Sequence, residues 1–180
     1  APSKQVTYLF TLPDRATYPY QIGQMDQMLE KAMALNCSKD VYFGLHLMDE
    51  PPLQGASASA SDISGISFIH GEYDIKGPAH KEENLPKTQE ELLNFPHGLE
   101  CPPSIIVHSG NGLHTYWLLQ EYTAVNDENR EAIKRIVKDH ELHTQKLGRA
   151  YGWKFDSVAD LARVLRIPGT LNHKSDPPRQ

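Results

Sequence analysis

The chain has 180 residues, of which 39% are hydrophobic and 23% are charged. That balance excludes a fully disordered chain and a collagen-like repeat, and no apolar run approaches the roughly 20 residues that a membrane-spanning helix needs. Cys37 and Cys101 do not form a Cys-x-x-Cys pair, so we expect neither a zinc ribbon nor a disulfide scaffold, and the cytoplasm is the favoured compartment. The sequence opens on Ala1 without a signal-peptide pattern, and we expect it to be excised from a larger protein.

The length suits one domain over residues 1–180, with an N-terminal αβ lobe at 1–60 and a motif-bearing lobe at 61–180. The net charge is -5, but it is unevenly distributed. Residues 1–129 contain 7 basic and 17 acidic side chains, whereas residues 130–180 contain 11 basic and 6 acidic ones. An acidic part beside a basic tail is typical of an interaction surface, and ordinary solvated helix faces are the other interpretation.

The first third of the chain predicts two strands and a helix. Residues 6–11 are β-branched and aromatic and predict a strand, and a polar, proline-containing stretch follows that ends near Tyr20. Apolar residues at helical spacing predict a helix over 24–35 with its methionines facing the core. Residues 41–47 predict a second strand, and the small and proline-rich residues 51–62 predict a flexible loop.

A strand, a short helix and a hairpin are expected next. The strand covers 66–74, and a capping box that begins at Thr88 opens a helix over 89–94. Strands at 104–109 and 113–119 are joined by a Gly-Asn-Gly turn and form the hairpin.

The last third predicts a long helix over 126–147 with Gly148 as its stop signal. A short strand at 153–156 follows, and residues 158–166 predict a helix or turn that ends at Pro168-Gly169. Strands and helices mix without a regular βαβ rhythm, so the pattern favours an α+β fold over a doubly wound sheet.

Glu72 and Asp74 form the first cluster of candidate functional residues. Side chains at positions i and i+2 of a strand point to the same face, so both carboxylates converge at the end of an apolar strand. Two like charges so close are costly unless a cation lies between them, and Mg²⁺ prefers such oxygen ligands. Lys76 and His80 follow closely and suit a phosphate. A solvated strand end is the alternative.

The second cluster is the segment 109–117, which begins with Ser109. Gly110 and Gly112 permit unusual backbone angles, and the backbone N–H groups of such a turn can bind an anion. His114 lies just beyond the turn and could donate to a phosphate oxygen. A plain hairpin with a surface histidine is the alternative interpretation.

The third cluster spans residues 156–174. Asp156 follows an apolar residue and offers a third metal ligand. Arg163 and Arg166 are three residues apart, so on a helix they would share a face and present guanidinium groups to phosphate. A helix held by salt bridges is the alternative.

Together the three clusters resemble the archaeo-eukaryotic primase superfamily, in the form found in phage, plasmid and CRISPR-associated primase-polymerases. The strings Ser-Gly-Asn-Gly-Leu-His-Thr-Tyr-Trp and Arg-Val-Leu-Arg-Ile-Pro-Gly-Thr-Leu-Asn-His-Lys support the resemblance most specifically, and it covers about residues 66–174. The resemblance implies an α+β catalytic core with an RRM-like sheet that carries the acidic residues. It also implies DNA primase or DNA polymerase activity, which is template-dependent nucleotidyl transfer.

The resemblance further implies roles for individual residues. Glu72, Asp74 and Asp156 match the catalytic acids that hold two divalent ions, Mg²⁺ or Mn²⁺. The positions implied to bind the nucleotide are Lys76, Ser109, Gly110, Gly112, His114, Arg163, Arg166 and Lys174. Glu72 stands where the family usually has Asp, and Asp160 competes with Asp156 for the third-ligand position.

The implied partners are a single-stranded DNA template with its primer, dNTPs or NTPs, and a helicase or helical priming domain in the parent protein, with no membrane. Candidates for a basic track along the template are Lys134, Arg135, Lys138, Lys146 and Arg149. Two other functions stay open: a catalytically idle nucleic-acid-binding module and a metal-dependent nuclease.

Overall fold

The computed structural model describes residues 4–77, 82–173 and 177–178. Within these residues, three α-helices surround an eight-stranded sheet with the order β6-β7-β5-β4-β1-β3-β8, and β2 pairs with β1. All of its strand pairs are antiparallel. The predicted α+β class is therefore confirmed.

One half of the sheet comes mainly from the N-terminal segments. Its elements are β1 (Val6–Leu12), β2 (Thr17–Gln21), the 3₁₀ helix η1 (Ile22–Gln24), α1 (Met25–Asn36), β3 (Asp40–Gly44) and β4 (Leu47–Met48). The short strand β8 (Val164–Arg166) joins this half by pairing with β3. The sheet thus contains strands from both predicted lobes, and its last strand, β8, pairs with a strand of the N-terminal lobe.

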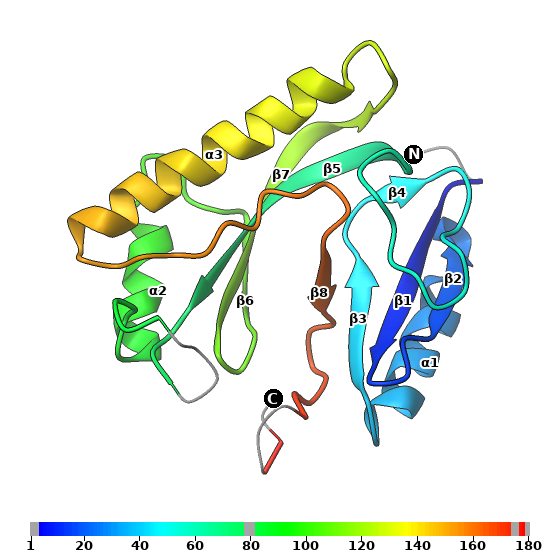
Figure 1. Cartoon of the computed structure of the whole chain (residues 1–180), viewed down its shortest axis with the longest axis horizontal. Helices are drawn as coiled ribbons and strands as arrows, with labels where there is room; N and C mark the ends of the chain where they lie inside the picture. The colour runs from blue at the N-terminus through cyan, green and yellow to red at the C-terminus, as the bar shows by residue number, and fades with distance from the viewer. Residues whose placement is uncertain (1–3, 78–81, 174–176, 179–180) are drawn as a thin grey trace.

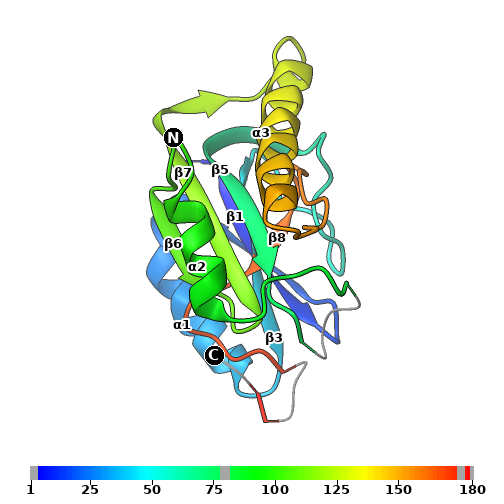
Figure 2. The same cartoon turned by 90° about the vertical axis from the view of Figure 1, so that its left-hand side faces the viewer.

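The other half is a long hairpin with one added strand. Its elements are β5 (Ile63–Asp74), α2 (Gln89–His97), β6 (Ile105–His108), β7 (Gly112–Ala124) and α3 (Arg130–Ala150). Figure 1 shows this half with α2 and α3 on one side of the molecule, and β1, β3 and α1 on the other, with β8 beside β3. In the turned view, α2 lies against β6 and β7 (Figure 2). No described helix combines the length and the apolar composition needed to cross a membrane.

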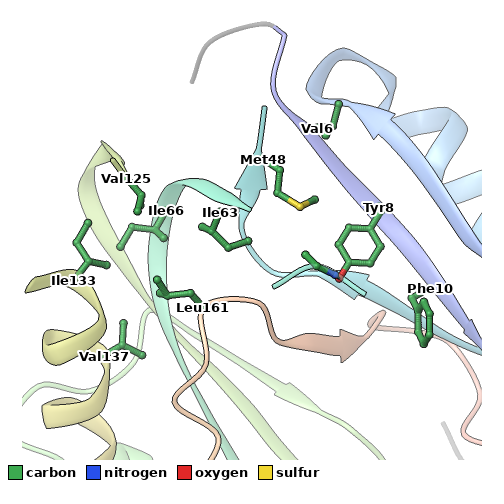
Figure 3. Close-up of a cluster of buried hydrophobic side chains, with 11 residues drawn as sticks. Val6, Tyr8, Phe10, Met48, Ile63, Ile66, Val125, Ile133, Val137 and Leu161 are labelled. Carbon is green, nitrogen blue, oxygen red and sulfur yellow. The ribbon is translucent and has the colours of Figure 1, made fainter. Parts of the chain in front are cut away.

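The largest hydrophobic cluster connects the two halves. Side chains from β1, β4, β5 and α3 meet around Leu161 (Figure 3), and Met48 and Tyr8 are almost fully buried there. The Tyr8 hydroxyl accepts a hydrogen bond from the Ala58 N–H at 2.9 Å, which satisfies the polar atom inside the cluster. Each fully buried large apolar side chain contributes about 1.5–3 kcal/mol, so this cluster holds the segment before β8 against β5.

A second cluster is aromatic and lies beneath the end of β5. Tyr73, Phe95, Trp153 and Phe155 pack edge to face or tilted, with ring centroids 4.8 to 6.1 Å apart. A Cβ at Gly148 would lie 2.6 Å from Phe155, so glycine leaves room for this ring against the helix.

Two predictions for the last third are wrong because of this packing, and a third holds only in part. The helix begins at Arg130 and passes through Gly148 to Ala150, because glycine there receives Phe155 instead of ending the helix. Residues 153–156 form no strand. Their aromatic side chains are buried because they pack into the second hydrophobic cluster, and their backbone joins no sheet. Of the helix or turn predicted over 158–166, a turn forms at 161–162 and no helix forms, whereas 164–166 form β8 by pairing with β3, so Arg163 and Arg166 do not share a helical face.

The N-terminal half differs from the sequence analysis in two places. Residues 17–21, for which no strand is predicted, form β2, because this edge strand pairs on one side only and tolerates Pro19. The methionines of α1 do not all face the core. Met28 is buried, whereas Met33 is 58% exposed.

Candidate active site

A cleft of about 360 Å³ opens between the end of β5, the β6–β7 turn and β8. Seven of the predicted site residues line it: Glu72, Asp74, Asp156, Ser109, His114, Arg163 and Arg166. They come from segments far apart in the sequence, so folding brings together the three clusters that the sequence predicts.

The three carboxylates reach the cleft by two routes. Glu72 and Asp74 alternate with the buried Tyr73 on β5 and therefore lie on one face of the sheet, paired across the strands with His114 and Gly112. Asp156 arrives from the segment without regular structure after α3.

This donor set fits a hard divalent cation in kind, because Mg²⁺ and Mn²⁺ prefer carboxylate oxygens. Across residues 4–77, 82–173 and 177–178, no three His, Cys, Asp or Glu side chains already stand close enough to hold an ion together. The position of Glu72 gives one reason, since its carboxylate is engaged elsewhere.

Arg163 is the partner of Glu72. Its Nε donates to Glu72 Oε1 at 2.6 Å, and the two side chains are 37% and 20% exposed. Burial alone would lower the pKa of Arg163, but the hydrogen bond and the charges of Glu72, Asp160 and Asp74 raise it. The guanidinium is therefore a permanent cation among the acids of the cleft.

His114 is buried on β7 beside Glu72. Burial, followed by the nearby His70, Arg166 and Arg163, lowers its pKa to about 4. Among the described residues, its Nδ1 has no hydrogen-bond partner. Near neutral pH, His114 can therefore offer a neutral imidazole to a ligand in the cleft, as an N–H donor and not as a cation.

Arg166 lines the same cleft but is bound to its surroundings. Its Nη1 donates to Asp40 Oδ1 at 2.7 Å and to the Leu171 carbonyl at 3.1 Å, and its Nη2 donates to the Tyr42 hydroxyl at 3.2 Å. Both side chains of the Arg166–Asp40 pair are at most 10% exposed. Because both Nη atoms donate to protein groups, these contacts favour a structural role for Arg166.

The turn between β6 and β7 brings the second cluster against β5. Ser109 N–H donates to the Gly112 carbonyl at 3.0 Å, and Ile75 N–H donates to the Asn111 carbonyl at 3.0 Å. Gly110 has a φ of 86°, which favours glycine. A Cβ on Gly112 would lie 2.1 Å from the Tyr73 carbonyl oxygen, so glycine permits the close approach of the two strands.

The structure does not bring every predicted residue to the cleft. Lys76 forms an ion pair with Glu83 and is not among the residues that line it. Gly110 and Gly112 shape the turn without lining the cleft. Lys174 and His80 lie outside the described residues.

Sequence reasoning missed three polar residues that line the cleft: Tyr42, Asn111 and Asn172. Both asparagines lie inside the two motif strings. An amide side chain within such a turn segment can bind a ligand, and this pattern would have indicated them. Tyr42 comes from β3, in the part of the sequence without a motif.

The basic residues of α3 are partly neutralised. Lys134, Arg135 and Lys138 form ion pairs with acids three or four residues along the same helix. Lys146 and Arg149 are exposed near its C-terminal end, so these two are the better candidates for a template contact.

Neither a protein-family model nor a curated protein matches the sequence. Among solved structures, the chain is similar to the AEP domain of the cyanophage S-2L primase-polymerase. The similarity covers 92% of this chain and 72% of that chain, with 15% sequence identity and a TM-score of 0.44. The function proposed below depends on the residues of the cleft.

Proposed function

We propose that this chain is the catalytic core of a DNA primase-polymerase, which adds nucleotides from nucleoside triphosphates to a strand paired with a template. The observation that supports this most strongly is the arrival of Glu72, Asp74 and Asp156 in one cleft with His114 and the glycine turn. A metal-dependent nuclease would use the acids, but it has no evident use for the turn and the buried imidazole.

Glu72, Asp74 and Asp156 would hold the divalent ions, Mg²⁺ or Mn²⁺. When bound, such ions supply positive charge to the triphosphate and lower the pKa of a hydroxyl nucleophile. The neutral His114 would donate an N–H to a phosphate oxygen, and Ser109 lies beside it on the cleft wall. Arg163 would add a fixed positive charge where negative charge develops.

The proposed partners follow from this chemistry. The primer and the single-stranded template would approach along Lys146 and Arg149, because exposed cations bind the phosphate backbone. We also propose that a helicase or a helical priming domain accompanies this core in a longer parent protein. Cys37 and Cys101 are both free and exposed, which suits the reducing cytoplasm.

Primer extension with Mg²⁺ or Mn²⁺ and labelled dNTPs tests the proposal. The wild-type chain should lengthen the primer, and Asp74→Asn should abolish extension because it removes a ligand charge while keeping the shape of the side chain. The matched control is Asp127→Asn, an exposed acid near the start of α3, which should extend like wild type. Shortening of the strand would favour the nuclease, and DNA binding without extension would favour the idle module.

A further inference from the structure

Three polar side chains of α3 contact the segment that carries Asp156. Lys138, Glu141 and Gln145 are spaced by three and four residues, so they lie on one face of the helix. The segment 155–159 opposite them has no helix or strand of its own. Its backbone polar groups therefore need partners other than a strand ladder.

Glu141 supplies most of these partners. Its side chain is only 7% exposed, and its carboxylate accepts hydrogen bonds from Val158 N–H, from Ala159 N–H at 2.7 Å and from Ser157 Oγ at 2.9 Å. Lys138 completes the set by pairing with the same carboxylate. A carboxylate offers about four lone-pair positions, and four donors surround this one.

The charge of Glu141 is also stabilised in place. Burial raises its pKa, but the hydrogen bonds from Lys138, Val158, Ala159 and Ser157 outweigh burial and hold the pKa below the ordinary value. The group is therefore an anion near neutral pH, and its hydrogen bonds are of the strong, charge-assisted kind.

Gln145 holds the other side of Asp156. Its Nε2 donates to the Phe155 carbonyl at 3.3 Å and to the Asp156 carbonyl at 3.1 Å. The backbone is thus fixed immediately before and after the candidate metal ligand, while the Asp156 side chain lines the cleft.

We propose that Glu141, assisted by Gln145, is a positioning residue that sets the location of Asp156 for metal binding. This inference rests on the proposed function, because it assumes that Asp156 is a ligand. Residues that orient metal ligands through hydrogen bonds typically change metal affinity by 10–100-fold when they are mutated. Asp156 needs such support more than Glu72 and Asp74, which the ladder of β5 already fixes.

The test is the Mn²⁺ affinity of the 180-residue chain without nucleotide or DNA, measured by titration with detection of free Mn²⁺ by electron paramagnetic resonance. Glu141→Ala should weaken Mn²⁺ binding by about tenfold or more. Gln145→Ala removes fewer contacts and should weaken it in the same direction by a smaller factor. The matched control is Glu131→Ala, because Glu131 pairs with Lys134 on the same helix but is 82% exposed. This control should bind Mn²⁺ like wild type.

A double-mutant comparison separates positioning from general damage. In an Asp156→Ala background, Glu141→Ala should weaken Mn²⁺ binding little further, because the ligand that it positions is gone. If Glu141→Ala does not fold, the folded Gln145→Ala variant decides, and wild-type Mn²⁺ affinity in that variant overturns the inference.

The two proposals fail in different ways. Primer extension by wild type, loss of Mn²⁺ binding in Asp156→Ala and unchanged affinity in Glu141→Ala would overturn the positioning role alone. A wild-type chain that neither binds Mn²⁺ nor extends a primer would overturn both.

Discussion

Arg163 and Glu72 join the segment before β8 to the end of β5 through a 2.6 Å hydrogen bond between oppositely charged groups. The Arg163 guanidinium is therefore bonded to the same carboxylate that the sequence motif predicts to be a metal ligand. A divalent cation bound at the proposed site would therefore compete with Arg163 for Glu72. The pair is partly exposed, so we expect that exchange to cost little.

The first prediction follows from this competition. Arg163→Ala should increase the affinity for Mn²⁺, because the ion no longer has to displace the guanidinium. The measurement is the upward shift of the melting temperature with Mn²⁺, which should be larger in Arg163→Ala than in wild type at the same concentration. Arg135→Ala is the control, since that arginine is 83% exposed on α3 and pairs only with Asp139 of the same helix among the salt bridges of the described residues. An equal or smaller shift in Arg163→Ala would contradict the competition.

Arg166 gives a second prediction, about stability. Arg166→Ala leaves Asp40 as an uncompensated buried charge, which typically costs about 3–5 kcal/mol in the free energy of unfolding. Denaturant titration measures this cost, and Arg135→Ala should stay within about 0.5 kcal/mol of wild type. Arg166→Lys should rescue only part of the loss, because an ammonium cannot reproduce the planar fork. A small cost together with a raised KM for the nucleotide would instead assign Arg166 to the triphosphate, as the sequence motif implies.

The parts of the site that the sequence could predict are those that depend on local spacing. Alternation along a strand places Glu72 and Asp74 on one face, and the glycine turn places His114 two residues beyond Gly112. Both relationships need only neighbours in the sequence. In the structure, Glu72 and Asp74 lie on one face of β5, and His114 follows the glycine turn on β7, as the sequence predicts.

The contacts that could not be predicted join residues far apart. Glu72 and Arg163 are separated by 91 positions, and Arg166 and Asp40 by 126. Local spacing suggested a helix for the two arginines, but three residues of β8 pair with β3 instead. The strand forms because β3 lies next to it near the edge of the sheet, and the residue pattern of 158–166 alone does not indicate that pairing.

Gly112 leads to a third prediction. In Gly112→Ala the new Cβ would lie 2.1 Å from the Tyr73 carbonyl oxygen and 2.9 Å from Asp74 Cα, both backbone atoms. The two strands must separate, so we expect a loss of about 1–3 kcal/mol in stability and weaker Mn²⁺ binding through the displaced Asp74. Gly23→Ala is the control, because nothing lies within 4 Å of its Cβ position. Unchanged Mn²⁺ binding in a folded Gly112→Ala variant would show that the turn does not affect the proposed metal site.

His46 supports the last prediction, which concerns pH. It is 2% exposed, its ring lies 5.0 Å from Phe68 and 6.3 Å from His70, and no described residue hydrogen-bonds to either ring nitrogen. Burial, and then the neighbouring His70, lower its pKa from 6.5 to about 3. In the unfolded chain the same imidazole takes up a proton near pH 6.5, so the unfolded state binds more protons between those two values. The stability that the neutral His46 contributes is therefore complete above about pH 6.5 and is lost as the pH falls toward 3.

His46→Gln removes this titration, so its free energy of unfolding should fall less steeply with decreasing pH than that of wild type. The difference in slope should approach about 1.4 kcal/mol per pH unit between pH 6 and pH 4, the value for one proton. Urea titrations at several pH values measure it, and the slopes are compared because the substitution also changes stability at neutral pH. His97→Gln is the control, since that histidine is exposed at the end of α2, and its curve should run parallel to wild type. Parallel curves for wild type and His46→Gln would mean that His46 is protonated in the folded protein as readily as in the unfolded chain.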